Sequence, residues 1–420
     1  MEELVSGPGA EAPLCRFCGA PLSEVFVDLG ASPLANSYLE PADLRRPEAF
    51  YPLCVYVCGA CLLVQLPEAE RPEAIFSDYA YFSSFSDSWL EHARTYAERM
   101  VGELALGSGS LVVEVASNDG YLLRWFRDRG VPVLGIEPAA NVARTAEEAG
   151  IPSRVQFFGT ETARQLAAEG LRADLLVGNN VLAHVPDLND FVAGLKIALA
   201  PAGVLTMEFP HLLRLMAEDQ FDTIYHEHYS YFSLAAVRRV FAHHGLALYH
   251  VEELPTHGGS LRIFARHAED ASRPVSLGVE ELLALEAAAG LDRIETYRSF
   301  AERVQAVKRR LLRFLIEAKE EGKSVVGYGA PAKGNTLLNY CGVRSDLLDY
   351  TVDRSPHKQG RYLPGTRIPI YSPERFAETR PDYVLILPWN LKEEIVGQMA
   401  HVRGWGGRFV VAIPEARVLA

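Results

Sequence analysis

Short apolar runs alternate with amphipathic stretches along most of the chain after residue 110. Residues 111–115 and 131–136 are mainly hydrophobic, which predicts buried strands. Residues 121–129 and 141–149 place apolar side chains at helical spacing. Strands that alternate with helices predict a parallel sheet with crossover helices, so we expect an α/β fold.

The same alternation continues to the C-terminus with one long break. It predicts a strand with its loop at 173–180, a helix at 189–199, a strand at 203–209, a helix at 234–244 and two short strands around 246–253 and 260–266. Residues 279–321 form a long, charged, interrupted helical region that acts as a connector. A second alternating block follows, with strands at 324–329, 349–352, 383–387 and 409–413 and helices from about 332 and at 391–401.

The segment from residue 15 to about 66 differs from the rest, because it is loop-rich and contains several cysteines. We therefore divide the chain into three parts. They are an N-terminal domain (1–70), a central domain (71–275), and a helical connector with a C-terminal α/β domain (276–420).

The composition is that of a globular protein without a membrane span. Hydrophobic residues make up 49% and charged residues 23% of the 420 residues, and no run of about 18 apolar residues occurs. The net charge is -13 without a dense Lys/Arg block, which argues against nucleic acid or membrane partners. The acidic N-terminus lacks the apolar core of a secretory signal, so we expect a cytoplasmic protein with reduced cysteines.

Two CxxC pairs lie about forty residues apart in the N-terminal segment. Cys15 and Cys18 form one pair and Cys58 and Cys61 the other, a pattern that predicts a tetrahedral structural Zn²⁺ site. A segment with so few apolar residues needs such a staple to fold. Cys54 competes for the fourth ligand position, and four unrelated buried cysteines are the alternative.

A turn of small and polar residues follows the strand at 111–115. An α/β sheet accepts a nucleoside ligand where a parallel strand ends and a helix begins. The turn resembles motif I of class I S-adenosylmethionine methyltransferases, an acid followed by three alternating glycines. The candidate cofactor contacts in this turn are Glu114, Ala116, Ser117, Asn118 and Gly120. Ala116 and Asn118 depart from the motif, because they replace its first two glycines.

Glu137 supports a nucleoside site in the same sheet. It ends the next strand, about twenty residues on, where a carboxylate accepts hydrogen bonds from both ribose hydroxyls. Asn179 and Asn180 follow another strand and are expected near the adenine and methionine ends of the cofactor. NAD is the competing ligand, but an acid at Asp119 suits a cationic sulfonium and repels a pyrophosphate. An ordinary turn without a ligand is the other alternative.

A second glycine-containing turn, at 327–335, also lies between a strand and a helix. Backbone N–H groups at the helix start, with Lys333 and Asn335, make a candidate cradle for the phosphate end of a substrate. The Walker A spacing is absent, and Asp353 after the next strand imitates a ribose-binding acid. A decayed Rossmann domain used for packing is the alternative.

Residues 225–232 contain two imidazoles, a carboxylate and four aromatic rings. Proton-transfer groups at this density, beside aromatic rings, indicate a catalytic pocket. On an extended segment His226 and His228 would point the same way, so a His-x-His metal site is a rival interpretation. A solvated aromatic-rich loop is the other.

The order of these motifs resembles one enzyme family over essentially the whole chain. After the zinc knuckles come Tyr79-Ala-Tyr81-Phe-Ser-Ser, the 114–120 turn, Leu-Ala-His184-Val-Pro-Asp, Tyr225-His-Glu-His228, His257-Gly-Gly-Ser-Leu-Arg262 and the 327–335 turn. This is similar to the S-adenosylmethionine-dependent sugar C-methyltransferases that make branched deoxysugars for antibiotics. The resemblance implies a small zinc-binding domain, a class I methyltransferase Rossmann-like sheet and a second Rossmann-like C-terminal domain.

By this resemblance the substrate is a dTDP-linked 4-keto-6-deoxysugar that is methylated at C3. The C–H bond beside a ketone is a weak acid, so the reaction needs a base and donors for the enolate oxygen. The resemblance makes His228 the base, with His184 or a tyrosine hydroxyl stabilising the enolate. The other residues expected around the sugar are Tyr79, Tyr81, Tyr225 and Glu227.

Two rival functions stay open at this point. One is methyl transfer to a different acceptor, such as an oxygen or nitrogen of a small molecule or of tRNA. The other is a non-catalytic nucleotide-sugar-binding protein, because two glycines of the cofactor turn are replaced. We expect a monomer with no nucleic acid or membrane partner.

Overall fold

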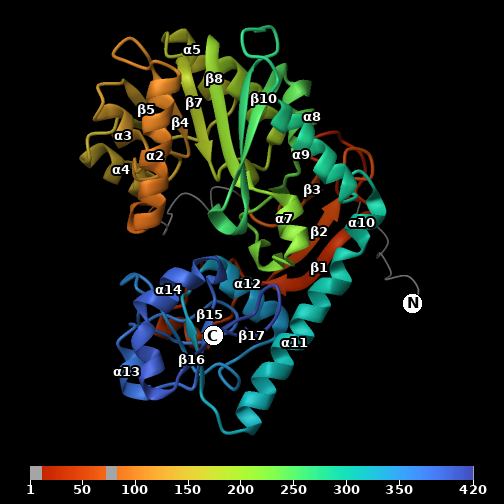
Figure 1. Cartoon of the computed structure of the whole chain (residues 1–420), viewed down its shortest axis with the longest axis vertical. Helices are drawn as coiled ribbons and strands as arrows, with labels where there is room; N and C mark the ends of the chain where they lie inside the picture. The colour runs from red at the N-terminus through yellow and green to blue at the C-terminus, as the bar shows by residue number, and fades with distance from the viewer. Residues whose placement is uncertain (1–11, 72–82, 420) are drawn as a thin grey trace.

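The computed structural model describes residues 12–71 and 83–419, which form three β-sheets with helices packed around them. The central sheet and the C-terminal sheet belong to two lobes (Figure 1). Strands β1 (Glu24–Ser32) and β2 (Tyr51–Val57) lie between the lobes, beside the long helix α11 (Phe300–Glu320).

The central sheet contains seven strands. In chain order they are β4 (Val112–Val115), β5 (Val133–Ile136), β6 (Ser153–Arg154), β7 (Ala173–Asn179), β8 (Leu199–Pro210), β10 (Leu246–Leu254) and β11 (Ser260–His267). They lie side by side in the order β10-β11-β8-β7-β4-β5-β6. The predicted parallel pairing holds from β6 to β8, whereas β11 is antiparallel to both of its neighbours. A short turn joins β10 to β11, and a hairpin connection makes an antiparallel pair.

Helices cover both faces of this sheet, as a parallel sheet requires. They are α2 (Asp87–Glu103), α3 (Leu123–Arg127), α4 (Ala140–Glu148), α5 (Thr160–Ala168), α6 (Leu188–Ala198), α7 (Leu212–Ala217), α8 (Leu234–His243) and α9 (Leu277–Ala288). Three of them begin at a capping side chain: Ser86 accepts a hydrogen bond from Trp89 N at 3.3 Å, Asp187 accepts one from Asp190 N at 3.0 Å, and Ser233 accepts one from Ala236 N at 3.1 Å.

The N-terminal sheet has the order β1-β2-β3-β9, with β3 at Val64–Gln65 and β9 at Ser230–Tyr231. Strand β9 comes from the middle of the chain, directly after His228, and pairs antiparallel with β3. The aromatic stretch at 225–232 is therefore tied to the cysteine-bearing unit by backbone hydrogen bonds.

The C-terminal sheet has the order β14-β13-β12-β15-β16-β17, parallel except for β17. Its strands are β12 (Val325–Tyr328), β13 (Thr351–Val352), β14 (Ile370–Tyr371), β15 (Tyr383–Ile386), β16 (Arg408–Val411) and β17 (Arg417–Val418). The helices of this lobe are α12 (Ala332–Cys341), α13 (Arg375–Thr379) and α14 (Lys392–Gln398). The predicted connector consists of α9, α10 (Ile294–Arg298) and α11.

Short 3₁₀ turns join several of these elements. They are η1 (Pro41–Arg45), η2 (Ser83–Phe85), η3 (Leu182–His184), η4 (Phe221–Thr223), η5 (Thr256–Gly258), η6 (Trp389–Leu391) and η7 (Ala400–Trp405). Two of them carry parts of the site, because η3 ends at His184 and η4 immediately precedes the 225–232 stretch.

One hydrophobic core extends from the N-terminal sheet through α11 into the C-terminal sheet. Phe26 of β1 stacks on Phe300 of α11 with ring centroids 4.6 Å apart. The N-terminal and C-terminal units therefore share buried surface. Among the described residues, no helix combines the length and the apolarity that crossing a bilayer requires.

Candidate active site

The four cysteines of the two CxxC pairs come together at the end of the N-terminal sheet. Their Sγ atoms all lie within 4.8 Å of one another, with 3.6 Å between Cys15 and Cys61 and 3.5 Å between Cys18 and Cys58. A tetrahedral zinc ion with Zn–S bonds of about 2.3 Å needs sulfur atoms about 3.8 Å apart. The cluster therefore fits the structural zinc ion predicted from the sequence.

Cys54 does not belong to the cluster. It lies on β2 opposite Asp28 of β1, and its thiol interacts with Tyr56. Outside the sulfur cluster, Gln65 donates a hydrogen bond to Cys15 Sγ at 3.1 Å and accepts one from Arg16 N at 2.9 Å. Such outer contacts fix the orientation of a metal ligand.

The turn after β4 has the backbone of a glycine motif although two of its glycines are replaced. The φ angles of Ala116, Asn118 and Gly120 are +57°, +51° and +75°, all in the left-handed region. The side chain of Ser117 is buried, and its Oγ would lie 2.3 Å from a Cβ at Gly135. The turn and β5 thus fit closely together.

Glu137 holds this turn in place from the end of β5. Its two carboxylate oxygens accept hydrogen bonds from Asn118 N and Ala139 N, both at 2.9 Å. Burial raises the pKa of Glu137 above its usual value. Each oxygen keeps a second lone pair that can accept a ribose hydroxyl.

Glu114 and Asn179 meet at the hydroxyl of Tyr121, below the same turn. Asn179 Nδ2 donates to Tyr121 Oη at 3.2 Å, and Glu114 also interacts with that hydroxyl. Burial raises the pKa of Glu114 well above its usual value. Glu114 and Asn179, which were both predicted to contact the cofactor, are thus joined through Tyr121 in one network of polar side chains.

His228 lies in a turn, where its N–H donates to Tyr225 O at 2.9 Å. Its Nδ1 is 2.7 Å from the carbonyl oxygen of Thr223, which can only accept a hydrogen bond. Nδ1 therefore carries the proton, and Nε2 keeps a lone pair. Burial, together with nearby His184, lowers the pKa of His228 well below the ordinary histidine value.

Two predicted residues pack against this imidazole, and a third precedes it in the chain. The rings of Tyr225 and His184 have centroids 4.0 Å and 4.7 Å from that of His228. Burial lowers the pKa of His184 to about 4, so this second imidazole is neutral as well. Glu227 is buried and accepts a hydrogen bond from Asn36 Nδ2 at 2.6 Å, which ties it to the N-terminal unit.

His226 turns away from His228. Its Nε2 lies 3.2 Å from Pro52 O, and its ring packs against Tyr51 with centroids 5.8 Å apart. The extended segment on which the rival metal-site interpretation depends is not formed, because residues 226–227 form a turn. A His-x-His metal site is therefore excluded, and the four cysteines are the only metal-ligand group among the described residues.

The C-terminal lobe brings a lysine near His228. Lys333 Nζ donates to Asn390 Oδ1 at 2.8 Å and lies 4.8 Å from the centre of the Trp389 ring. Trp389 Nε1 donates to the buried carboxylate of Asp222 at 2.7 Å. The charge of Lys333 also helps to lower the pKa of His228, so both lobes contribute to this site.

The remaining predicted substrate contacts have different outcomes. Asn335 is buried, and its Nδ2 donates to Ala35 O at 2.6 Å, so its amide holds the N-terminal unit. Asp353 Oδ2 accepts from Ala330 N at 2.8 Å and thereby fixes the turn before α12. Tyr79 and Tyr81 lie outside the described residues, and their roles stay predictions.

Sequence patterns did not single out several polar residues at this site. Glu208 and Trp389 lie twenty or more residues from His228 in the sequence, and Asp222 is near it but belongs to none of the motifs. Only His257 carried a local signal, because two glycines follow it. A histidine before a glycine pair at the tip of a hairpin indicates an irregular turn.

Comparison with known proteins identifies the family. Three family models match: "Putative zinc binding domain" at residues 15–76, "Methyltransferase domain" at 89–251 and "C-methyltransferase C-terminal domain" at 255–414. The C-methyltransferase NovU of Streptomyces niveus is 39% identical over 409 residues, which cover 97% of this chain and 96% of NovU. The chain belongs to the C-methyltransferase family. It is an S-adenosylmethionine-dependent enzyme with a structural zinc site.

More distant similarities cover less than half of the chain. A ubiquinone biosynthesis O-methyltransferase of Methylobacterium sp. (strain 4-46) is 31% identical over 128 residues, 29% of this C-methyltransferase and 50% of that enzyme. Among solved structures, the PH0226 protein of Pyrococcus horikoshii OT3 matches at a TM-score of 0.37 and 15% identity, covering 46% of this chain and 97% of that one.

The cofactor edge of this C-methyltransferase fits S-adenosylmethionine. Buried oxygen atoms of Glu114, Asp119 and Asn180 have no hydrogen-bond partner among the described residues. Glu114 lies near the end of β4, Asp119 and Asn180 lie on the loops that follow β4 and β7, and the ribose-type acid Glu137 directly follows β5. Unpaired acceptors suit a ligand that brings an ammonium group, hydroxyls and a sulfonium charge.

Proposed function

We propose that this C-methyltransferase methylates a dTDP-linked 4-keto-6-deoxysugar at C3, with His228 as the base. The observation that carries the proposal is the state of the His228 imidazole. It is neutral because it is buried, and its Nδ1 proton is held by Thr223 O at 2.7 Å. A neutral imidazole with a lone pair on Nε2 is prepared to take a proton from carbon.

The chemistry follows from the acidity of the C–H bond beside the ketone. His228 Nε2 takes the C3 proton and becomes an imidazolium, while the electron pair of the broken bond moves into the enolate. His184 or the Tyr225 hydroxyl donates a hydrogen bond to the enolate oxygen. S-adenosylmethionine, when bound, would supply an electrophilic methyl group, whose bond to sulfur would break with its electron pair left on the thioether as C3 forms the new C–C bond.

Lys333 supports an anionic sugar nucleotide as the substrate. The protein carries a net charge of -13, yet this ammonium group lies beside the histidine cluster at the junction of the two lobes. A cation at this position attracts the diphosphate or the enolate that forms from the ketosugar. We include Glu227 and Tyr225 in the sugar site, because both flank His228 in the same turn.

A pair of matched variants tests the role of His228. His228→Gln is expected to lower methyl transfer to dTDP-4-keto-6-deoxysugars by about 100-fold or more. It should also stop exchange of the C3 hydrogen with deuterium from solvent, measured by mass spectrometry. The glutamine can replace the hydrogen bond to Thr223 but has no basic nitrogen.

His226→Gln is the control, because the imidazole of His226 contacts Pro52 O and not the histidine pair of His184 and His228. This variant should keep both methyl transfer and exchange. Undiminished exchange in His228→Gln would assign the base to another group, with His184 as the next candidate. Transfer by the wild-type enzyme to a sugar nucleotide without a ketone would contradict the proposed reaction itself.

A further inference from the structure

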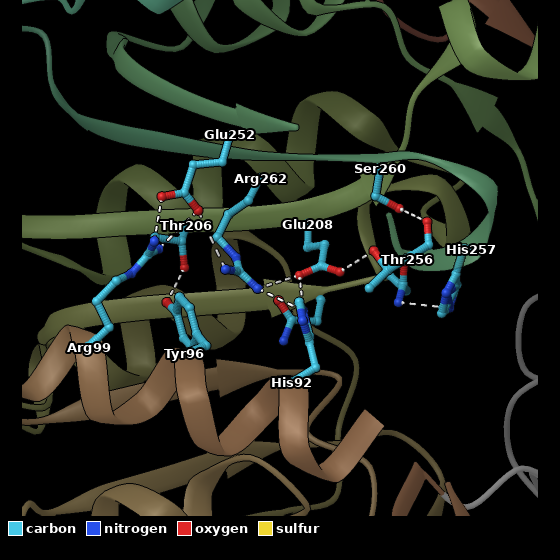
Figure 2. A network of polar contacts seen from close by, with 12 residues as sticks. His92, Tyr96, Arg99, Thr206, Glu208, Glu252, Thr256, His257, Ser260 and Arg262 are labelled. Atoms are coloured by element: carbon cyan, nitrogen blue, oxygen red, sulfur yellow. Dashed lines mark hydrogen bonds and ion pairs between the residues drawn. The ribbon is translucent and has the colours of Figure 1, made fainter. Parts of the chain in front are cut away.

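Helix α2 is joined to the central sheet by a network of polar side chains (Figure 2). His92, Tyr96 and Arg99 lie three or four residues apart, so all three face the sheet from one side of the helix. Arg99 forms a two-point ion pair with Glu252 of β10, with contacts of 2.6 and 2.9 Å. Tyr96 Oη lies 2.6 Å from Thr206 Oγ1 of β8.

Glu208 of β8 is the centre of this network, and its side chain is fully buried. Its Oε2 accepts hydrogen bonds from Arg262 Nη2 at 2.5 Å and from His92 Nε2 at 2.8 Å. Its Oε1 accepts a hydrogen bond from Thr256 Oγ1 at 2.9 Å. Burial alone would raise the pKa of Glu208, but His92 and Arg262 lower it to about 2. Glu208 is therefore a permanent anion with a fixed geometry.

Thr256 connects this anion to a strained turn. His257 has φ +56°, a left-handed conformation that is unfavourable for a non-glycine residue. Gly258 and Gly259 follow with φ +92° and +114°. A Cβ at Gly258 would lie 2.5 Å from Trp389 Cη2, so the turn fits tightly against the C-terminal lobe.

The strained residue lies beside the loop that follows β7. His257 Nε2 lies 3.3 Å from Asn180 Nδ2, on the loop after β7 that belongs to the predicted cofactor edge. His257 also contributes to lowering the pKa of His228. Its imidazole therefore contacts the loop after β7 and lies within electrostatic reach of His228, and strain held at such a place is typical of functional residues.

The hydrogen bond with Asn180 indicates what His257 can do. The Asn180 amide N–H donates to Nε2, so the neutral imidazole carries its proton on Nδ1. Burial, followed by the charge of Lys333, lowers the pKa of His257 to about 4. Within residues 12–71 and 83–419 the only hydrogen bond found for this imidazole is the one at Nε2, so Nδ1–H can donate to a ligand.

We propose that His257 donates a hydrogen bond to the methyl acceptor, and that Glu208, acting through Thr256, is the residue that positions it. Asn180 fixes the ring, Thr256 fixes the turn, and Glu208 is anchored by Arg262 and His92. This assignment rests on the proposed function, since the acceptor oxygen is that of the ketosugar.

Three variants of the turn test the proposal in the full-length zinc-loaded enzyme. Thr256→Val keeps the shape and removes the hydroxyl that bonds to Glu208, so kcat should fall by about tenfold to 100-fold. Thr256→Ser keeps the hydroxyl and should restore kcat to within about threefold of wild type. His257→Asn tolerates the left-handed backbone and should lower kcat by about 100-fold. All three should bind S-adenosylmethionine with the wild-type dissociation constant, measured by calorimetry.

Thr206→Val is the matched control. It removes one buried hydroxyl contact between the same helix and the same strand, two residues from Glu208, but does not touch the turn. Its melting temperature should fall as much as that of Thr256→Val, while kcat stays within about twofold of wild type. Equal loss of kcat in both valine variants would show that Glu208 only docks the helix, and would overturn the proposal.

A measurement without substrate separates this proposal from the proposed function. In ¹⁵N-histidine-labelled enzyme, the signal lost in His257→Asn identifies His257, and we expect it to report a neutral Nδ1–H tautomer. Thr256→Val should broaden or shift this signal, and Thr206→Val should not. An unchanged signal in Thr256→Val would refute the positioning role even if no sugar nucleotide is methylated.

Discussion

His226 and His228 are two residues apart, yet their imidazoles have different surroundings. One is bonded to the carbonyl of Pro52, and the other is bonded to Thr223 O and flanked by Tyr225. The turn at 226–227 separates them, so only His228 joins the second imidazole, His184. At this scale a backbone turn, not the identity of the residue, selects the candidate base.

The lowered pKa of His228 predicts the pH dependence of the enzyme. A base acts only when it is deprotonated, so kcat/KM falls as the pH drops through its pKa. Burial places that pKa well below the ordinary histidine value of about 6.5. The acidic limb of kcat/KM for the ketosugar should therefore have its midpoint below pH 6.5. Measurements of kcat/KM, which reports on the free enzyme, from about pH 5 to 8 test this. A midpoint at or above pH 6.5 would contradict it.

Strand pairing joins the zinc unit to the catalytic turn. Cys61 is followed by β3, β3 pairs with β9, and β9 begins two residues after His228. Arg16, next to a zinc ligand, donates to Pro186 O at 2.6 Å, two residues after His184. Two short strands, which are weak elements by themselves, thus depend on the metal for their position.

Loss of zinc is therefore expected to affect catalysis indirectly. Four cysteine ligands would fill the coordination sphere of the ion and leave no position for a substrate. Structural zinc contributes on the order of 10 kcal/mol to small zinc domains. Cys18→Ser should lose the ion, lower the melting temperature and reduce kcat by about tenfold or more, because β3 no longer holds β9. Zinc content by mass spectrometry, thermal melting and methyl transfer test this.

Cys54→Ser is the control for the zinc experiment, since Cys54 lies outside the sulfur cluster. It should keep one zinc ion per chain and wild-type activity. Loss of the ion in Cys54→Ser, with retention in Cys18→Ser, would exclude the four-cysteine site.

The whole molecule is held together by a core that crosses from the N-terminal sheet to the C-terminal lobe. Phe26 and Phe300 stack at its middle, and Trp389 of the C-terminal lobe contacts the turn at Gly258. Both lobes contribute side chains around His228, because Lys333 comes from one lobe and the histidines come from the other. The division of the chain at residues 70 and 275 stays a prediction.

The shared core predicts cooperative unfolding of distant segments. Phe300→Ala should lower the free energy of unfolding by about 3–5 kcal/mol, the usual effect of a cavity left by a buried aromatic ring. Hydrogen exchange should rise in β1 and β12 together. Ile316→Ala on the same helix, where the side chain is 46% exposed, should change stability by no more than about 0.5 kcal/mol. Exchange that rises in β1 alone would show two independent cores.

Much of the fold follows from local patterns. The apolar runs at β4, β5 and β12 predict strands because a parallel strand buries both faces. The cofactor edge was predictable for a similar reason, since Glu137 and Asn180 each end a strand, and parallel strands end at the same edge. The four cysteines have a spacing that is itself a signal.

Tertiary structure alone decided the rest. Glu208 is one acid among many in the sequence, and it becomes central only when Thr256 and Arg262 fold back onto β8 beside His92. Pairing of β9 with β3 spans more than 160 residues and leaves no periodic pattern. The sequence by itself determined the strands and the grouping of the four cysteines, because these depend on neighbours in the chain, while the residues of the cofactor edge stay a prediction. The group of side chains around His228 comes from distant parts of the sequence, and only the packing of the folded chain brings them together.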